Sequence, residues 1–147
     1  MQLSRLKLPA AALALTMMLL SGCAVNRATA IADPTANFAD IKRLHVMRLQ
    51  QDDRGINQLI ADRLNRMGYV TTTGPGKPKE ADAIVTYADR WIWDMSMYMV
   101  ELTIAVREPA TDFPLATANS LHTSLTRKSP QEMVDEVTTN LFKAVKK

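Results

Sequence analysis

A chain of 147 residues that is 47% hydrophobic and 22% charged has the composition of one globular domain, which argues against disorder, collagen-like repeats and long coiled coils. Its net charge of +3 falls to +1 once Arg5 and Lys7 are removed with the segment described next. So weak a positive charge predicts no nucleic-acid partner, because nucleic-acid binding needs a concentrated basic face.

The first 22 residues have the three parts of a secretory signal peptide. Residues 1–7 carry two positive charges and no acid, residues 9–20 form an apolar run, and Ser21 and Gly22 are small. The run is shorter than the roughly twenty apolar residues of a membrane-spanning helix. We therefore predict that residues 1–22 direct export and are then removed.

The apolar run ends in Leu20-Ser21-Gly22-Cys23, which resembles the lipobox of bacterial lipoproteins. In that family the cysteine thiol receives a diacylglycerol before cleavage makes it the first residue, and three acyl chains anchor the mature protein permanently. Cys23 is the only cysteine, so no disulfide and no catalytic thiol are expected. Ala24, and not aspartate, follows the cysteine, which resembles the enterobacterial pattern for sorting to the outer membrane. The resemblance implies a lipid bilayer as partner through acylated Cys23, on the periplasmic face of the outer membrane.

The segment after the lipobox is rich in small and polar residues and shows no apolar period. We predict that residues 23–37 form a lipidated flexible tether and that residues 38–147 form a single domain. About fourteen flexible residues would reach ~20 Å from the membrane.

The domain is predicted to begin with a strand and a helix. Residues 41–49 mix β-branched and long apolar residues with charges, which indicates a strand. Asp52 or Asp53 is placed to cap the helix that follows. Apolar residues recur at helical spacing over residues 56–67, and Gly68 follows where a left-handed C-cap is common.

The rest of the chain predicts several strands and a second helix. Ser129-Pro130-Gln131-Glu132 has the Ser-x-x-Glu capping box with proline at the first helical position, so a helix is expected from there to the end. The strands expected before it are residues 69–73, 83–93, 98–107 and 115–126, with a loop at 74–78 and a reversal at 94–97.

The predicted order β-α-β-β-β-β-α favours an α+β fold, in which a mixed or antiparallel sheet of about five strands carries both helices on one face. The apolar faces of these elements predict the core. Its expected members are Leu44, Val46, Ile56, Leu59, Ile60, Leu64, Val100, Leu102, Ile104, Val106, Val134, Val137 and Leu141.

One predicted strand carries the pattern Tyr-x-Asp-x-Trp-x-Trp-Asp, formed by Tyr87, Asp89, Trp91, Trp93 and Asp94. This pattern resembles a family of uncharacterised small bacterial envelope lipoproteins. The order of elements also resembles the N-terminal domain of the Tol translocation protein, the lipoprotein activators of penicillin-binding proteins and the curli secretion lipoprotein. The resemblance covers residues 38–147 and implies an accessory or assembly role in the envelope, with no catalytic site.

The residues themselves also predict no enzyme. His45 and His122 are the only histidines, and neither belongs to a recognised nucleophile, zinc or phosphate-loop motif. Ser120, His122 and Ser124 alternate along a predicted strand, so they are neighbours on one face and not an oriented triad. We expect no catalytic residues and no cofactor.

Met95, Met97 and Met99 suggest an alternative function. Along a strand they would place three thioethers about 7 Å apart on one face, and soft sulfur ligands favour Cu(I). Methionine also fills apolar gaps, and the reversal predicted at 94–97 would break the row. Periplasmic Cu(I) binding is therefore the alternative hypothesis.

The first hypothesis is contact with an envelope protein partner at the sheet face that the helices leave open. The even-numbered residues of 98–107 are apolar and are assigned to the helices, which leaves Met97 and Met99 on the open face. In the next strand the leucines, including Leu121, are assigned inward, so the small even-numbered residues from 116 to 124 share the open face.

Trp91 and Trp93 complete the predicted partner site. If both lie on the open face, they join Met97 and Met99 near the turn, and these residue types are enriched at interfaces. In the alternative arrangement the tryptophans point inward and close the core. The sequence thus predicts an outer-membrane-anchored periplasmic lipoprotein that acts through protein–protein contacts.

Overall fold

The computed structural model describes residues 26–146, so the predicted signal peptide, residues 1–22, and Cys23 lie outside the described residues. The described elements are β1 (Asn26–Ala32), η1 (Phe38–Asp40), β2 (Arg43–Met47), α2 (Ile56–Arg66), β3 (Val70–Gly74), β4 (Ala83–Asp94), β5 (Ser96–Arg107), β6 (Pro114–His122), η2 (Ser124–Thr126) and α3 (Pro130–Val145).

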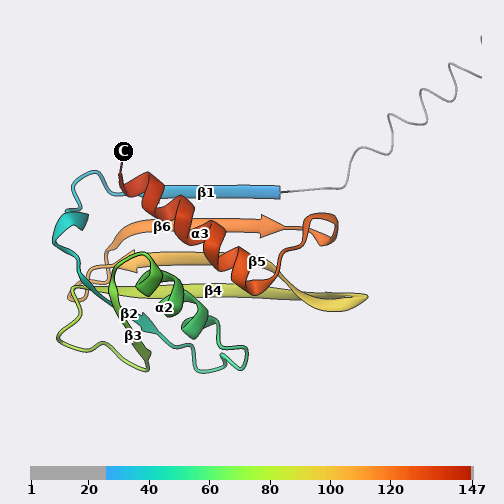
Figure 1. Cartoon of the computed structure of the whole chain (residues 1–147), viewed down its shortest axis with the longest axis horizontal. Helices are drawn as coiled ribbons and strands as arrows, with labels where there is room; N and C mark the ends of the chain where they lie inside the picture. The colour runs from blue at the N-terminus through green and yellow to red at the C-terminus, as the bar shows by residue number, and fades with distance from the viewer. Residues whose placement is uncertain (1–25, 147) are drawn as a thin grey trace, which may run out of the picture.

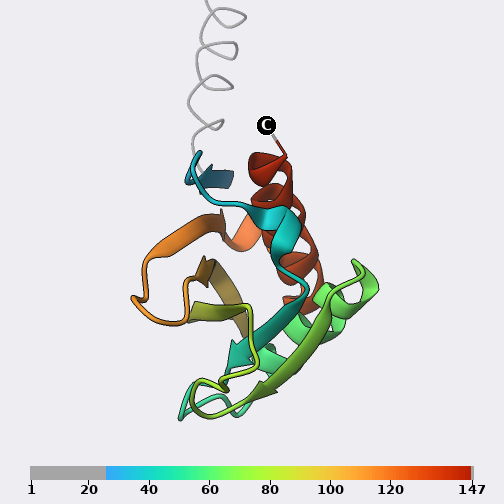
Figure 2. The ribbon, with the colours of Figure 1, turned by 90° about the vertical axis from the view of Figure 1, so that its left-hand side faces the viewer.

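The strands form one mixed sheet in the order β1-β6-β5-β4-β2-β3. The pairs β1–β6, β6–β5 and β5–β4 are antiparallel, whereas β2 runs parallel to both β4 and β3. Both helices pack on the same face of this sheet (Figures 1 and 2). The predicted α+β class is confirmed, with a sixth strand at the edge of the sheet. No helix of residues 26–146 is both long enough and apolar enough to cross a bilayer.

The sixth strand comes from the segment predicted as a tether, and the tether prediction for residues 23–37 is therefore wrong over β1. All seven residues of β1 pair with β6, from Asn26 with His122 to Ala32 with Ala116. Alanines of β1 and β6 lie under α3, where short side chains let a helix approach the sheet closely. This tertiary role leaves no apolar period in the sequence.

The helix ends largely follow the local predictions. Gly68 has φ +97°, as the predicted C-cap of α2 requires. Ser129 and Glu132 form the predicted capping box at α3, each bonding the other's backbone N–H. At α2, however, the N-cap position is Gly55, and Asp52 reaches the first turn with its side chain from three residues further back.

A bulge in β5 reverses the predicted faces near the turn. Glu101 pairs with Arg90, but the next pair is Met99 with Trp91, so Val100 is an extra residue. An extra residue shifts the side-chain alternation by one position. Met99 therefore joins the core under the helices, and the assignment of Met97 and Met99 to the open face is wrong.

The predicted faces of β6 are also inverted. Ala116 and Ala118 belong to the core, and Ser120 and His122 are buried on the same side, facing α3. Leu121 is half-buried and pairs with Glu101, on the face away from the helices. The register with β5 decides this arrangement, because Ile104 of the core pairs with Ala118.

Candidate functional site

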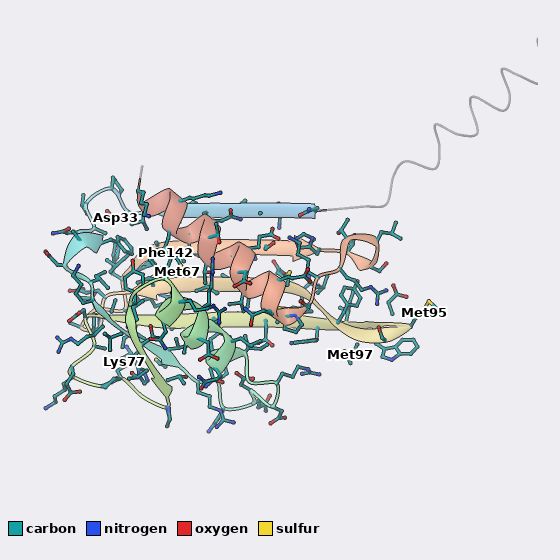
Figure 3. The ribbon with its side chains drawn as sticks, in the orientation of Figure 1. Asp33, Met67, Lys77, Met95, Met97 and Phe142 are labelled. Carbon is teal, nitrogen blue, oxygen red and sulfur yellow. The ribbon has the colours of Figure 1, made fainter. Side chains whose placement is uncertain are left out.

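The β4–β5 hairpin projects beyond the rest of the sheet and exposes three large apolar side chains. Trp93 is 73% exposed, Met95 is 88% exposed and Met97 is 50% exposed. Trp93 and Met97 pair across the hairpin, and Met95 forms its turn. Figure 3 shows Met95 and Met97 at the free end. We call Trp93, Met95 and Met97 the hairpin tip.

The structure divides the predicted partner site. Trp93 and Met97 are exposed, but Met99 is fully buried and Trp91 packs against the core. The indole N–H of Trp91 donates to Asp89 Oδ2 at 2.5 Å. The guanidinium of Arg54 lies 4.3 Å from the centre of the Trp91 ring. Trp91 therefore closes the core, whereas Trp93 does not, and neither arrangement considered for the pair is correct.

The methionines do not form the row that the copper hypothesis assumed. Met95 lies in the turn with φ +58°, and Met99 is in the core. Within residues 26–146 no three His, Cys, Asp or Glu side chains are grouped to hold a metal ion. His45 is buried between Thr72 Oγ1 at 2.8 Å and the carbonyl of Gly74 at 3.3 Å. This geometry gives no reason to prefer Cu(I) binding.

The first part of the Tyr-x-Asp-x-Trp pattern fixes the loop between β2 and α2. The Tyr87 hydroxyl donates to Asp52 Oδ2 at 2.6 Å and accepts the N–H of Leu49 at 3.2 Å. Asp52 also accepts the backbone N–H groups of Ile56 at 3.1 Å and Asn57 at 2.9 Å, at the start of α2. The pattern is therefore structural at Tyr87, Asp89 and Trp91, whereas its next residue, Trp93, is exposed.

The charge of Asp52 suits this role. Burial raises the pKa of the Asp52 carboxyl, but the hydrogen bonds from Tyr87 and from the backbone outweigh burial and hold the pKa below its usual value. Burial and the bond to Asp52 in turn raise the pKa of Tyr87. The sequence indicated Asp52 as a capping residue, but its partner on β4 is 35 residues away and gave no local signal.

A second polar cluster lies between β6 and α3. Glu136 of α3 accepts hydrogen bonds from Ser120 Oγ at 2.8 Å, from His122 Nε2 at 3.0 Å and from Lys128 Nζ. Burial raises the pKa of Glu136, but these three bonds outweigh it, so the pKa lies below its usual value. The carboxylate bridges the serine and the histidine, an arrangement in which histidine is not placed to activate serine.

This cluster predicts a loss of stability in acid. Because the folded pKa of Glu136 is lowered, its contribution is present above the usual value of 4.5 and is lost as the pH falls through the folded pKa. We expect Glu136→Gln to lower the free energy of unfolding by about 2–3 kcal/mol at pH 7, and the gap to close toward pH 3. Urea unfolding between pH 7 and pH 3 measures this.

The control for that experiment is Asp53→Asn, which changes an exposed acid. Its urea midpoint should follow that of the unchanged chain at every pH. A Glu136→Gln gap that stays constant between pH 7 and pH 3 would contradict the role given to the carboxylate.

Comparisons with known proteins give a fold likeness only. No family model matches the sequence, and no curated protein matches it. The PelC dodecamer from Paraburkholderia phytofirmans is similar in structure, with a TM-score of 0.58 at 14% identity over 79% of this chain and 96% of that chain. A variant of the same dodecamer in a second crystal form gives the same values.

A PDZ domain protein from Parabacteroides distasonis is a weaker match, with a TM-score of 0.47 at 11% identity. The match covers 88% of this chain and 38% of that chain.

Proposed function

We propose that the chain is a lipoprotein of the bacterial cell envelope, held by acylated Cys23 on the periplasmic face of the outer membrane. Its domain would serve as an accessory or assembly component that acts through protein–protein contacts. The lipobox ending in Cys23 supports the anchor. The observation that carries the contact role is the open edge of β1.

Strand β1 pairs with β6 on one side and with no strand of the described residues on the other. Unpaired strand edges attract further strands, and proteins usually protect them with lysine, proline or bulges. Residues 26–29 are exposed, contain no proline and carry one charge, on Arg27. At the opposite edge, by contrast, Asn65 accepts the N–H of Thr71 at 2.9 Å and so occupies one backbone donor of β3.

We infer that the occupant of the β1 edge is a second copy of this chain. The fold likeness supports this choice, because the similar PelC structure is a dodecamer. An open edge at one end of a sheet suits head-to-tail contacts between copies, which close into a ring or continue as a filament.

Acylation is tested with Cys23→Ala in the full chain. Lipoprotein processing needs the thiol, so we expect the variant to keep its precursor mass and to decrease at least tenfold in the outer-membrane fraction. Fractionation and intact mass measure both effects. A variant that is processed and fractionates like the unchanged chain would show that Cys23 is not the anchor.

Self-assembly is tested with a photo-crosslinking amino acid at Ile31, exposed on β1, and at Gln58, exposed on α2, as the matched control. We expect adducts at multiples of the monomer mass from position 31 only. Thr29→Lys adds a protecting charge at the exposed edge and should lower their yield at least fivefold. Adducts with a different protein would contradict a second copy as occupant, and no adduct at all would contradict the contact role.

A further inference from the structure

Exposed apolar side chains gather at the free end of the hairpin. Beside the three residues of the hairpin tip lies η2, where Leu125 is 75% exposed. Arg127, just after η2, donates to Ser96 Oγ at 3.0 Å, and its guanidinium lies 4.7 Å from the centre of the Tyr98 ring. The two segments therefore form one surface, which holds four of the eight large apolar side chains exposed in residues 26–146.

The chain enters the domain at this same end. Asn26, the first residue of β1, pairs with His122, the last residue of β6. One position further in, Arg27 pairs with Leu121, and Leu121 pairs with Glu101 of β5. Figure 1 shows the start of β1 on the side toward which the hairpin projects.

The lengths of these segments place the hairpin tip at the level of the anchor. Residues 96–100 of β5 extend past Glu101, which is about 16 Å at about 3.3 Å per residue. Cys23 is three residues before Asn26, or at most about 11 Å of extended chain. Lipids on Cys23 would therefore bring the bilayer surface within reach of the hairpin tip.

The chemistry of this surface suits the boundary between lipid headgroups and acyl chains. Tryptophan is enriched at that depth, and arginine attracts anionic headgroups. Trp93 and Met97 supply the apolar area, and Arg127 lies exposed beside them, 3.9 Å from Asp94, which it partly neutralises. Amphipathic helices at this boundary bury their apolar face about 5–10 Å deep, which sets the depth expected for the hairpin tip.

Met95 gives an independent indication. Its φ of +58° is a conformation that favours glycine, asparagine or aspartate, and a long apolar side chain there is uncommon. Met95 is also the most exposed of the large apolar residues, so its packing does not explain it. An exposed apolar side chain in an unfavourable backbone conformation points to a contact outside the domain.

We propose that the hairpin tip, with Leu125 and Arg127, is a membrane-docking surface that inserts into the headgroup boundary of the bilayer to which the chain is anchored. The inference rests on the proposed acylation of Cys23, which sets the distance to the membrane. The domain would then have a fixed orientation, with its free hairpin end toward the lipid.

The experiment measures the depth of Trp93. Trp91→Phe in the full acylated chain leaves Trp93 as the only tryptophan. The protein is reconstituted into phosphatidylethanolamine–phosphatidylglycerol vesicles whose acyl chains are brominated near the headgroup. We expect more than half of the Trp93 emission to be quenched. The matched variant Trp93→Phe reports on the half-buried Trp91 and should lose less than a fifth.

A further change tests the turn. Met95→Asn suits the backbone conformation of the turn, so it should leave the urea midpoint unchanged or higher while lowering the quenching of Trp93 at least twofold. Unquenched Trp93 would overturn the proposal. If Trp93 is unquenched but shielded from aqueous acrylamide, a protein covers the hairpin tip and lipid does not.

A measurement without substitution covers the case in which Trp91→Phe does not fold. In vesicles of the unchanged chain, a charged oxidant should convert Met67, half-buried at the end of α2, faster than Met95. Without a membrane contact, Met95 would be oxidised first, because it is the more exposed of the two side chains. Faster oxidation of Met95 in the vesicles would therefore overturn the proposal.

The intact mass of the same samples separates this inference from the proposed function. An acylated chain with unquenched Trp93 overturns the docking surface and leaves the anchor in place. An unacylated chain with quenched Trp93 overturns the anchor and keeps the docking surface.

Discussion

Leu102→Ala should lower the free energy of unfolding by about 2–5 kcal/mol, the cost of removing a buried leucine side chain and leaving a cavity. Leu102 is fully buried at the centre of the sheet, where β5 lies between β4 and β6 under the helices. Many domains of this size have only about 5–15 kcal/mol of stability in total, so the loss would be a large fraction. Urea unfolding at equilibrium measures it.

Leu121→Ala is the matched control. Leu121 lies on β6 next to Ser120, the partner of Leu102, but points to the other face and is half-buried. We expect it to cost under about 2 kcal/mol, because a half-buried side chain has less buried apolar surface to lose when it is truncated. A Leu121→Ala loss larger than that of Leu102→Ala would show that the faces of β5 and β6 are assigned wrongly.

Asp52→Asn should cost about 2–4 kcal/mol and loosen the loop before α2. The carboxylate accepts four hydrogen bonds, from Tyr87 and from the backbone of Arg54, Ile56 and Asn57. An amide presents one acceptor oxygen and one donor group, so at least one buried N–H or the hydroxyl loses its partner. Urea unfolding gives the loss, and amide exchange of residues 49–57 reports the loop.

Tyr87→Phe and the double variant complete this test. Removal of the hydroxyl alone should cost about 1–2 kcal/mol, since it leaves Asp52 with its backbone partners. The double variant should lose less free energy of unfolding than the two single variants lose in sum, because both changes remove the same bond. Strict additivity would contradict a direct bond between Tyr87 and Asp52.

The parts of the fold that the sequence predicted have local signals. The amphipathic period of α2, the C-cap Gly68 and the capping box at Ser129 depend on residues close together in the chain, and all are present. Strand β1 has no such signal, because its short side chains fit under α3 only when the sheet has formed. The faces of β6 were assigned wrongly for the same reason, because Ala116 and Ala118 also have short side chains that pack under α3.

The candidate site was predicted only in part, because one residue changed the alternation of β5. Nothing in the local sequence marks Val100 as a bulge, since it is neither glycine nor proline. The bulge turns Met99 into the core beside Trp91 and leaves Met97 and Trp93 beyond the helices. The sequence places the tryptophans and methionines near the turn, but only the pairing of β4 with β5 shows which of these side chains are exposed and which are buried.

The anchor at Cys23 is the central proposal, because both the envelope location and the orientation of the hairpin tip depend on it. The most direct measurement is the mass of the N-terminal peptide of the mature protein, isolated from membranes and digested. We predict a peptide that begins at Cys23 and carries a diacylglycerol on its thiol. A mature chain that begins elsewhere, or begins at an unmodified Cys23, would contradict the proposed acylation of Cys23.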